Sequence, residues 1–87
     1  MIDFTKYNLD NDDLEFLDRL KGDLEFLNEN LLEYNGITFS VEPCEGKIVV
    51  YTDNEAFETF EDFDDLLLNF KINGIPMIEF IKDIDFA

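Results

Sequence analysis

The segment from Thr52 to Phe70 constrains the fold more than any other, because its large apolar residues recur at steps of three and four. This spacing is typical of one face of an α-helix. The residues that follow it are Phe57, Phe60, Phe63, Leu67 and Phe70. The acidic residues between them point away from that face. The segment therefore predicts a helix with an aromatic side for a core and an acidic side for water or a partner.

Both ends of this helix carry recognisable signals. Thr52 followed three residues later by Glu55 fits a capping box, although Asp53 or Asn54 can cap the helix instead. Asn73-Gly74 can stop it, because glycine readily adopts the left-handed conformation that ends many helices.

Residues 75–87 fit two structures. With Pro76 at the first helical position, the isoleucines that follow it at steps of three form one side of a short helix. Alternatively, Asn73-Gly74 is a two-residue turn between two strands, and Pro76 then confines the second strand to a sheet edge. We favour the helix, because the isoleucine spacing is helical and Lys82-Asp83 interrupts the strand alternation.

A first helix is predicted from about Asn11 to Tyr34, where leucines alternate at steps of three and four until Asn35-Gly36 supplies a stop. Gly22 and Phe26 do not fit a straight helix. Glycine is a poor helix former, and Phe26 lies about 180° from the leucine side at about 100° per residue. Either the helix bends near Gly22 or has a wide buried face, which we favour, or Phe26 faces solvent and awaits a partner.

A β-hairpin follows the first helix. Apolar and polar residues alternate from Ile37 to Glu42, residues 43–46 have turn composition, and residues 47–52 are β-branched and aromatic. Two strands alone are marginal, so helices must cover one face, and residues 2–7 offer a third strand. The predicted fold class is α+β in a single domain, residues 1–87. It consists of a long N-terminal helix, the antiparallel hairpin and two C-terminal helices packed on one sheet face.

The charge balance excludes several classes of partner. The 87 residues include 22 acids and six bases, which gives a net charge of −16. Nucleic acid and anionic membranes both require Lys and Arg on the protein, so direct binding to either is not expected. A basic protein surface is the natural complement, for example that of a nuclease or another nucleic-acid-binding protein.

The residue types also argue against catalysis. Without histidine and with Cys44 as its single cysteine, the chain lacks the usual general base, nucleophile pairs and zinc ligands. It has no glycine-rich phosphate-binding motif, and the acidic run at residues 10–13 lacks the central glycine and closing glutamate of a calcium-binding loop. We therefore expect no enzyme activity, no metal site and no organic cofactor.

Three further features predict a cytoplasmic protein. A single cysteine excludes an intrachain disulfide and fits a reducing compartment. The N-terminal residues lack the basic and apolar regions of a secretory signal. The longest aliphatic run, Leu66–Leu68, is much too short to span a membrane.

The leading hypothesis is a non-enzymatic protein whose acidic surface binds a basic partner, as an inhibitor, an immunity protein or antitoxin, a mimic of DNA, or an adaptor. A surface selected only for solubility would normally carry both positive and negative charges. The predicted helices instead carry few lysines between their acidic residues, which favours a binding role. The predicted partner-binding residues are Glu25, Phe26, Glu29 and Glu33 from the first helix and Glu55, Glu58, Glu61, Asp62 and Asp65 from the later one.

The alternative hypothesis is a small structural domain that forms a homodimer through exposed apolar residues and has no inhibitory role. A chain of this length buries only about 60–65% of its surface, so some large apolar side chains are expected to remain exposed. The residues expected to do so are Phe26, Leu32, Phe80 and Phe86.

Overall fold

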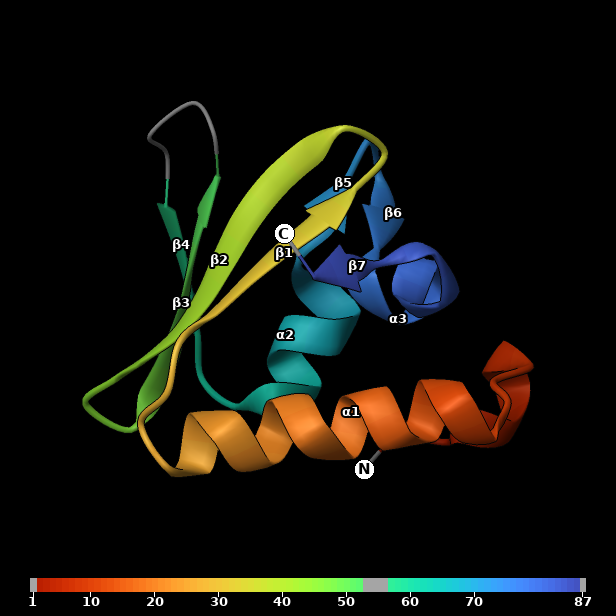
Figure 1. The fold of residues 1–87 in the computed structure, drawn as a ribbon, viewed down its shortest axis with the longest axis horizontal. Helices are drawn as coiled ribbons and strands as arrows, with labels where there is room; N and C mark the ends of the chain where they lie inside the picture. Colours follow the sequence, from red (N-terminus) through yellow and green to blue (C-terminus); the bar gives the residue numbers. More distant parts are fainter. Residues whose placement is uncertain (1, 53–56, 87) are drawn as a thin grey trace.

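The computed structural model describes residues 2–52 and 57–86, which adopt an α+β fold (Figure 1). The α-helices are α1 (Asn11–Glu25), α2 (Phe63–Asn69) and α3 (Met77–Phe80), and the 3-10 helices are η1 (Phe4–Tyr7) and η2 (Ile81–Asp83). The longer strands are β1 (Asn30–Tyr34), β2 (Ile37–Cys44), β3 (Lys47–Thr52) and β4 (Phe57–Phe60). The short strands are β5 (Lys71–Ile72), β6 (Ile75–Pro76) and β7 (Asp85–Phe86).

Five of these strands form one antiparallel sheet in the order β4-β3-β2-β1-β7, while β5 and β6 form a separate two-stranded ribbon. The α-helices lie on one side of the larger sheet, as the sequence predicted (Figure 1). Because side chains alternate between the faces of a strand, one set from each long strand points toward the helices. Leu32, Phe39, Val50 and Phe60 belong to this set, and they join leucines of α1 in a single core cluster.

Three two-residue turns connect neighbouring strands, and each ends in glycine. The turns are Asn35-Gly36, Glu45-Gly46 and Asn73-Gly74, and both residues of each have positive φ. Positive φ at both positions is the requirement of the type I′ turn, which matches the twist of the paired strands. The predicted hairpin between residues 37 and 52 is confirmed by the pairing of β2 with β3. The prediction that Asn35-Gly36 stops a helix is wrong, since this dipeptide joins β1 to β2.

The first helix is shorter than predicted. α1 continues through Gly22 but ends at Glu25, and residues 30–34 form β1 instead. The end of α1 is a Schellman motif, in which the N–H of Asn28 donates to the carbonyl of Asp23 and the N–H of Leu27 donates to that of Leu24. The leucine spacing placed Leu27 and Leu31 on the buried side of a continuing helix, but both are exposed, and Leu32 is buried from β1 instead.

The helix predicted from Thr52 to Phe70 is also wrong in its first half. Thr52 ends β3, and Phe57–Phe60 is the edge strand β4, whose Thr59 pairs with Val49. A helix begins only at Phe63, with Asp62 as its N-cap. Phe60 and Phe70 are buried as predicted, but Phe60 belongs to strand β4 and Phe70 is the residue that follows α2. Glu55 and the alternative caps Asp53 and Asn54 lie outside the described residues.

The terminal segments differ from the predictions in different ways. Residues 4–7 form the 3-10 helix η1, not the third strand that was offered as an option. Both predictions for the C-terminal segment are confirmed in part. Asn73-Gly74 is a turn between the short strands β5 and β6, and the chain then enters α3 directly after Pro76. Among residues 2–52 and 57–86, no helix has both the length and the apolar character needed to cross a bilayer.

Candidate functional site

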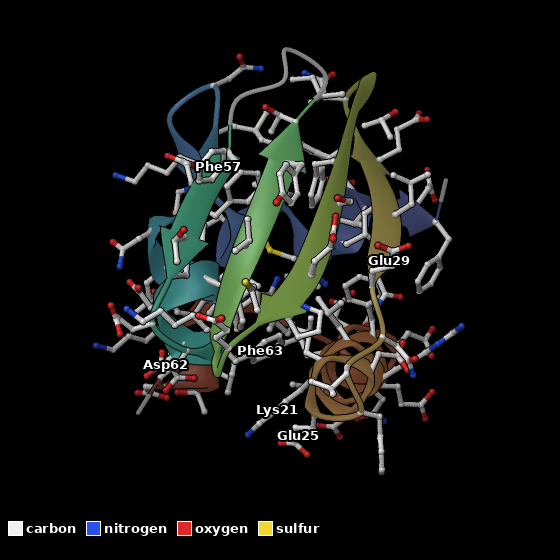
Figure 2. All side chains as sticks on the ribbon, turned by 90° about the vertical axis from the view of Figure 1, so that its left-hand side faces the viewer. Lys21, Glu25, Glu29, Phe57, Asp62 and Phe63 are labelled. Carbon is white, nitrogen blue, oxygen red and sulfur yellow. The ribbon has the colours of Figure 1, made fainter. Side chains whose placement is uncertain are left out.

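The face of the five-stranded sheet opposite the helices is not covered by any described element (Figure 2). The strand registers place four side chains in one line across this face, since Leu31 pairs with Ser40, Ser40 with Tyr51, and Tyr51 with Phe57. Directly paired side chains of antiparallel strands lie about 5 Å apart at Cβ, so these four form a continuous surface. We call this line the apolar row.

The apolar row exposes large side chains that a core would normally bury. Leu31 is 50% exposed, Tyr51 44% and Phe57 65%. The rings of Tyr51 and Phe57 contact each other, with their centroids 5.8 Å apart. Exposed apolar residues scattered singly need no explanation, but here Tyr51 and Phe57 are adjacent, and Leu31 lies in the same line beyond Ser40.

Carboxylates flank the apolar row on both sides. One neighbouring line contains Asp85, Glu33 and Thr38, and the other contains Glu42, Val49 and Thr59. The hydroxyl of Ser40 donates a hydrogen bond of 2.8 Å to the carboxylate of Glu42, which holds that charge beside the row. An aromatic centre with charged residues around it is the usual composition of a protein–protein interface.

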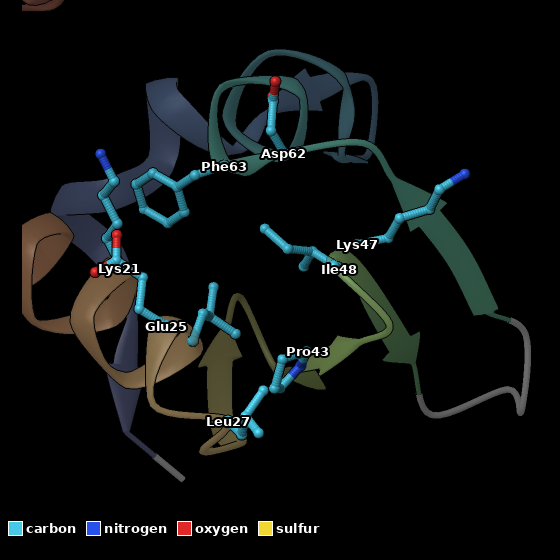
Figure 3. Close-up of a pocket in the computed structure, with 10 residues that line it drawn as sticks. Lys21, Glu25, Leu27, Pro43, Lys47, Ile48, Asp62 and Phe63 are labelled. Atoms are coloured by element: carbon cyan, nitrogen blue, oxygen red, sulfur yellow. The ribbon is translucent and has the colours of Figure 1, made fainter.

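A groove lies on the helix side of the sheet, where the end of α1, the turn between β2 and β3, and the start of α2 meet (Figure 3). Its volume is about 380 Å³. The apolar side chains that line it are Leu24, Leu27, Pro43, Ile48 and Phe63, and the charged ones are Lys21, Glu25, Lys47 and Asp62. Lys47 also forms an ion pair of 3.1 Å with Glu61.

The predicted acidic wall of residues 55–65 does not exist as one helix surface. Glu58 faces the helix side of β4 and lines a different pocket. Asp62 caps α2, and Asp65 accepts hydrogen bonds from the N–H of Glu61 and the side chain of Asn69. The first of these bonds, supported by the second, holds the pKa of Asp65 below its ordinary value. Asp62 and Asp65 therefore stabilise the local fold.

The other predicted residues lie nearer to the groove and the open face. Glu25 and Asp62 line the same groove, so the structure brings together two acids that are far apart in sequence. Phe26 is 81% exposed at the cap of α1, which supports the alternative that it faces solvent. Glu29 is exposed before β1, and Glu33 lies beside the apolar row. Glu55 is outside the described residues.

Of the apolar residues expected to remain exposed, Leu32 and Phe80 are buried in the core. Phe86 is half-exposed, and the guanidinium of Arg19 lies 4.6 Å from the centre of its ring. The sequence interpretation missed Leu31, Tyr51 and Phe57 as surface residues. Residues 47–52 carry no alternation that would have separated Tyr51 from its buried neighbours, since Ile48, Val49 and Val50 are all apolar and buried.

Two observations concern the chemistry available to the described residues. Within residues 2–52 and 57–86, no three acidic or cysteine side chains converge in a way that could hold a metal ion. Asp13 has a lowered pKa: burial by itself raises it, but hydrogen bonds from the N–H of Asp10 and from Lys82 outweigh that effect. Lys82 lies 3.0 Å from Asp13 and ties η2 to the start of α1, so this pair belongs to the fold.

Comparison of the chain with protein-family models, with curated proteins and with solved structures found no match. The geometry of its own residues is therefore the basis for the function proposed below.

Proposed function

We propose that this chain is a non-enzymatic interaction protein that binds a basic protein through the open face of its sheet. The observation that carries the proposal is the apolar row with exposed Leu31, Tyr51 and Phe57, which has carboxylates in the neighbouring line on either side. The aromatic residues would supply contact area, and the carboxylates would supply charge complementarity and orientation.

Charge supports a basic partner over other classes. The chain has 22 acids against six bases, and Lys47, the base on the strands that form the open face, is already paired with Glu61. A surface of this sign repels phosphate groups, so nucleic acid and anionic lipid are unsuitable as direct partners. Proteins that bind nucleic acid have the opposite sign on their working surface. Inhibition of such a protein, as by an immunity protein, an antitoxin or a DNA mimic, is the form of this function that we favour.

A homodimer formed through the apolar row is the alternative, and the exposure of Phe57 and Tyr51 is the observation that favours it. Two copies at −16 each would repel one another at low ionic strength, so such a dimer would need salt. Light scattering across a salt series separates the two. Homodimerisation predicts a dimer that strengthens with salt, whereas a basic partner predicts a monomer whose complexes weaken with salt.

Two double variants with the same change in net charge test the proposal. Glu33→Lys with Glu42→Lys reverses the charge beside the apolar row, while Glu15→Lys with Asp18→Lys does so on the exposed surface of α1. Both are measured by biolayer interferometry against a panel of purified nucleases and DNA-binding proteins. For any binder in the panel, we expect the first pair to lower the association rate about tenfold or more and the second pair to have a much smaller effect.

Equal losses in the two double variants would contradict the proposal, because they would show that net charge alone determines binding. A third variant, Phe57→Ser, tests the aromatic centre. It should accelerate dissociation and leave the association rate nearly unchanged, since the contacts of Phe57 form after the encounter.

A further inference from the structure

Two consecutive apolar residues at the end of α1 are exposed without serving the fold. Phe26 is 81% and Leu27 78% exposed. Leu27 also occupies the left-handed region with φ of 63°, where a side chain branched like leucine is uncommon and glycine or asparagine is usual. Neither burial nor the Schellman motif therefore accounts for a leucine at this position.

Leu27 separates two concave surfaces of different chemistry. On one side is the groove of Figure 3, whose floor is apolar and whose rim carries two lysines and two acids. On the other side is an open hollow, which is lined by Leu27 and Pro43 together with Asn28, Glu29, Glu42 and Glu45. Among the described residues, the lining of the hollow contains three carboxylates and no base. We call it the acidic hollow.

The acidic hollow is continuous with the open sheet face. Glu42 lines the hollow and also stands beside the apolar row, where Ser40 holds its carboxylate. A partner that covers the apolar row can therefore extend into the hollow, and it reaches the groove by passing around Leu27 to the helix side of the sheet.

The groove and the acidic hollow differ in charge, so they suit different side chains of one bound segment. The charges on the rim of the groove balance, so a partner gains little there from a charge and more from an apolar side chain that covers Leu24 and Phe63. In the acidic hollow, three carboxylates favour a cation, and an arginine can bind carboxylates through two parallel hydrogen bonds.

We infer that the groove beside α1 receives an apolar side chain of the basic partner and that the acidic hollow receives an adjacent arginine or lysine of the same segment. In this arrangement Leu27 lies between the apolar side chain and the arginine or lysine and contacts both. This inference rests on the proposed function, because it locates the anchor of the same basic partner.

Short peptides test the inference with the full chain at low salt. The probes are acetyl-Leu-Arg-Arg-amide, acetyl-Ser-Arg-Arg-amide, which lacks the apolar side chain, and acetyl-Leu-Glu-Glu-amide, which has the opposite charge. Binding is followed by amide chemical shifts in ¹⁵N-labelled protein. We expect saturable shifts around Leu24, Leu27 and Phe63 with the first peptide, about fivefold or more weaker binding of the second, and none of the third.

Leu27→Gly is the informative variant, because it removes the side chain and suits the left-handed backbone. It should keep or raise the melting temperature and weaken binding of acetyl-Leu-Arg-Arg-amide about fivefold or more, so that unfolding cannot explain the loss. The matched control is Leu14→Ala, which truncates an exposed leucine within α1, away from the groove, and should bind as the parent does.

The outcomes separate the inference from the proposed function. Equal binding of the two basic peptides, or unchanged binding by Leu27→Gly, would overturn the inference. If the basic peptides shifted only residues of the open sheet face, the proposed function would stand and the groove would be excluded. If no basic peptide bound anywhere at low salt, the inference would be refuted, while the proposed function would still be decided by the charge-reversal variants of Glu33 and Glu42.

Discussion

Replacing Gly22 by alanine should stabilise this protein. Gly22 lies inside α1, where its carbonyl accepts a hydrogen bond of 3.1 Å from the N–H of Phe26. A Cβ atom built at this position meets no heavy atom within 4 Å, so the added methyl group needs no rearrangement. Alanine is favoured over glycine in a helix interior by about 1 kcal/mol, partly because it restricts the unfolded chain.

The size of the effect is measurable in a chain of 87 residues. For a domain of this size, a gain of 1 kcal/mol raises the melting temperature by roughly 4–8 °C. Thermal unfolding followed by far-ultraviolet circular dichroism therefore resolves it, and urea unfolding gives the free energy independently.

Gly36 supplies a matched control. Its Cβ would also meet nothing within 4 Å, but its φ is 79°, as the turn between β1 and β2 requires. Gly36→Ala should therefore destabilise by roughly 1–2 kcal/mol through backbone strain alone. The two variants add the same atom in open space and should differ in sign. A loss of stability in Gly22→Ala would refute the reasoning, because it would mean that α1 is not a regular helix at this residue.

Three other perturbations have expected outcomes. The melting temperature should rise between about 20 and 300 mM sodium chloride, since screening relieves the repulsion of a chain at −16, and a fall would contradict this. Asn30→Val should raise the free energy of unfolding by about 1–2 kcal/mol in urea, because the Asn30 side-chain nitrogen is buried without a partner among the described residues. The pKa of Asp13 is lowered by hydrogen bonds that outweigh burial, so its stabilisation is present above the ordinary value of 3.8 and is lost as pH falls through the folded pKa. The difference in melting temperature between the parent and Asp13→Asn should therefore shrink with acidification below that value, and a constant difference would contradict the assignment.

The hairpin of β2 and β3 could be predicted from sequence because its signals are local. Its alternation of apolar and polar residues and the turn at residues 43–46 lie within one short segment. Asn35-Gly36 shows the limit of such signals. A left-handed Asn-Gly pair serves equally as the stop of a helix or as the turn of a hairpin, and only the pairing of residues 30–34 with β2 decides between them.

Phe57–Phe60 shows the same limit for a longer pattern. In Phe57-Glu58-Thr59-Phe60, a step of three between the aromatic residues matches a helix, yet the segment forms the edge strand β4. Its place is fixed by pairing with Val49 and Val50, which belong to another part of the chain. The excess of acidic residues could be predicted from composition. Which of these residues share a surface depends on such non-local pairings. The structure therefore places the partner-binding residues that helical spacing had predicted together on several different surfaces.

The proposed function connects the charge of the chain to its stability. Within the described residues, ion pairs link Lys47 to Glu61 and Lys82 to Asp10 and Asp13, so most of the 22 acids have no cation to offset them. Their mutual repulsion opposes the compact state. A basic partner that binds only the folded chain would relieve that repulsion and add the free energy of binding to that of folding. Under the proposed function, the carboxylates beside the apolar row would oppose folding of the free protein and favour the complex. A chain selected for stability alone would be expected to replace them, and this argument supports the open face as the proposed binding surface.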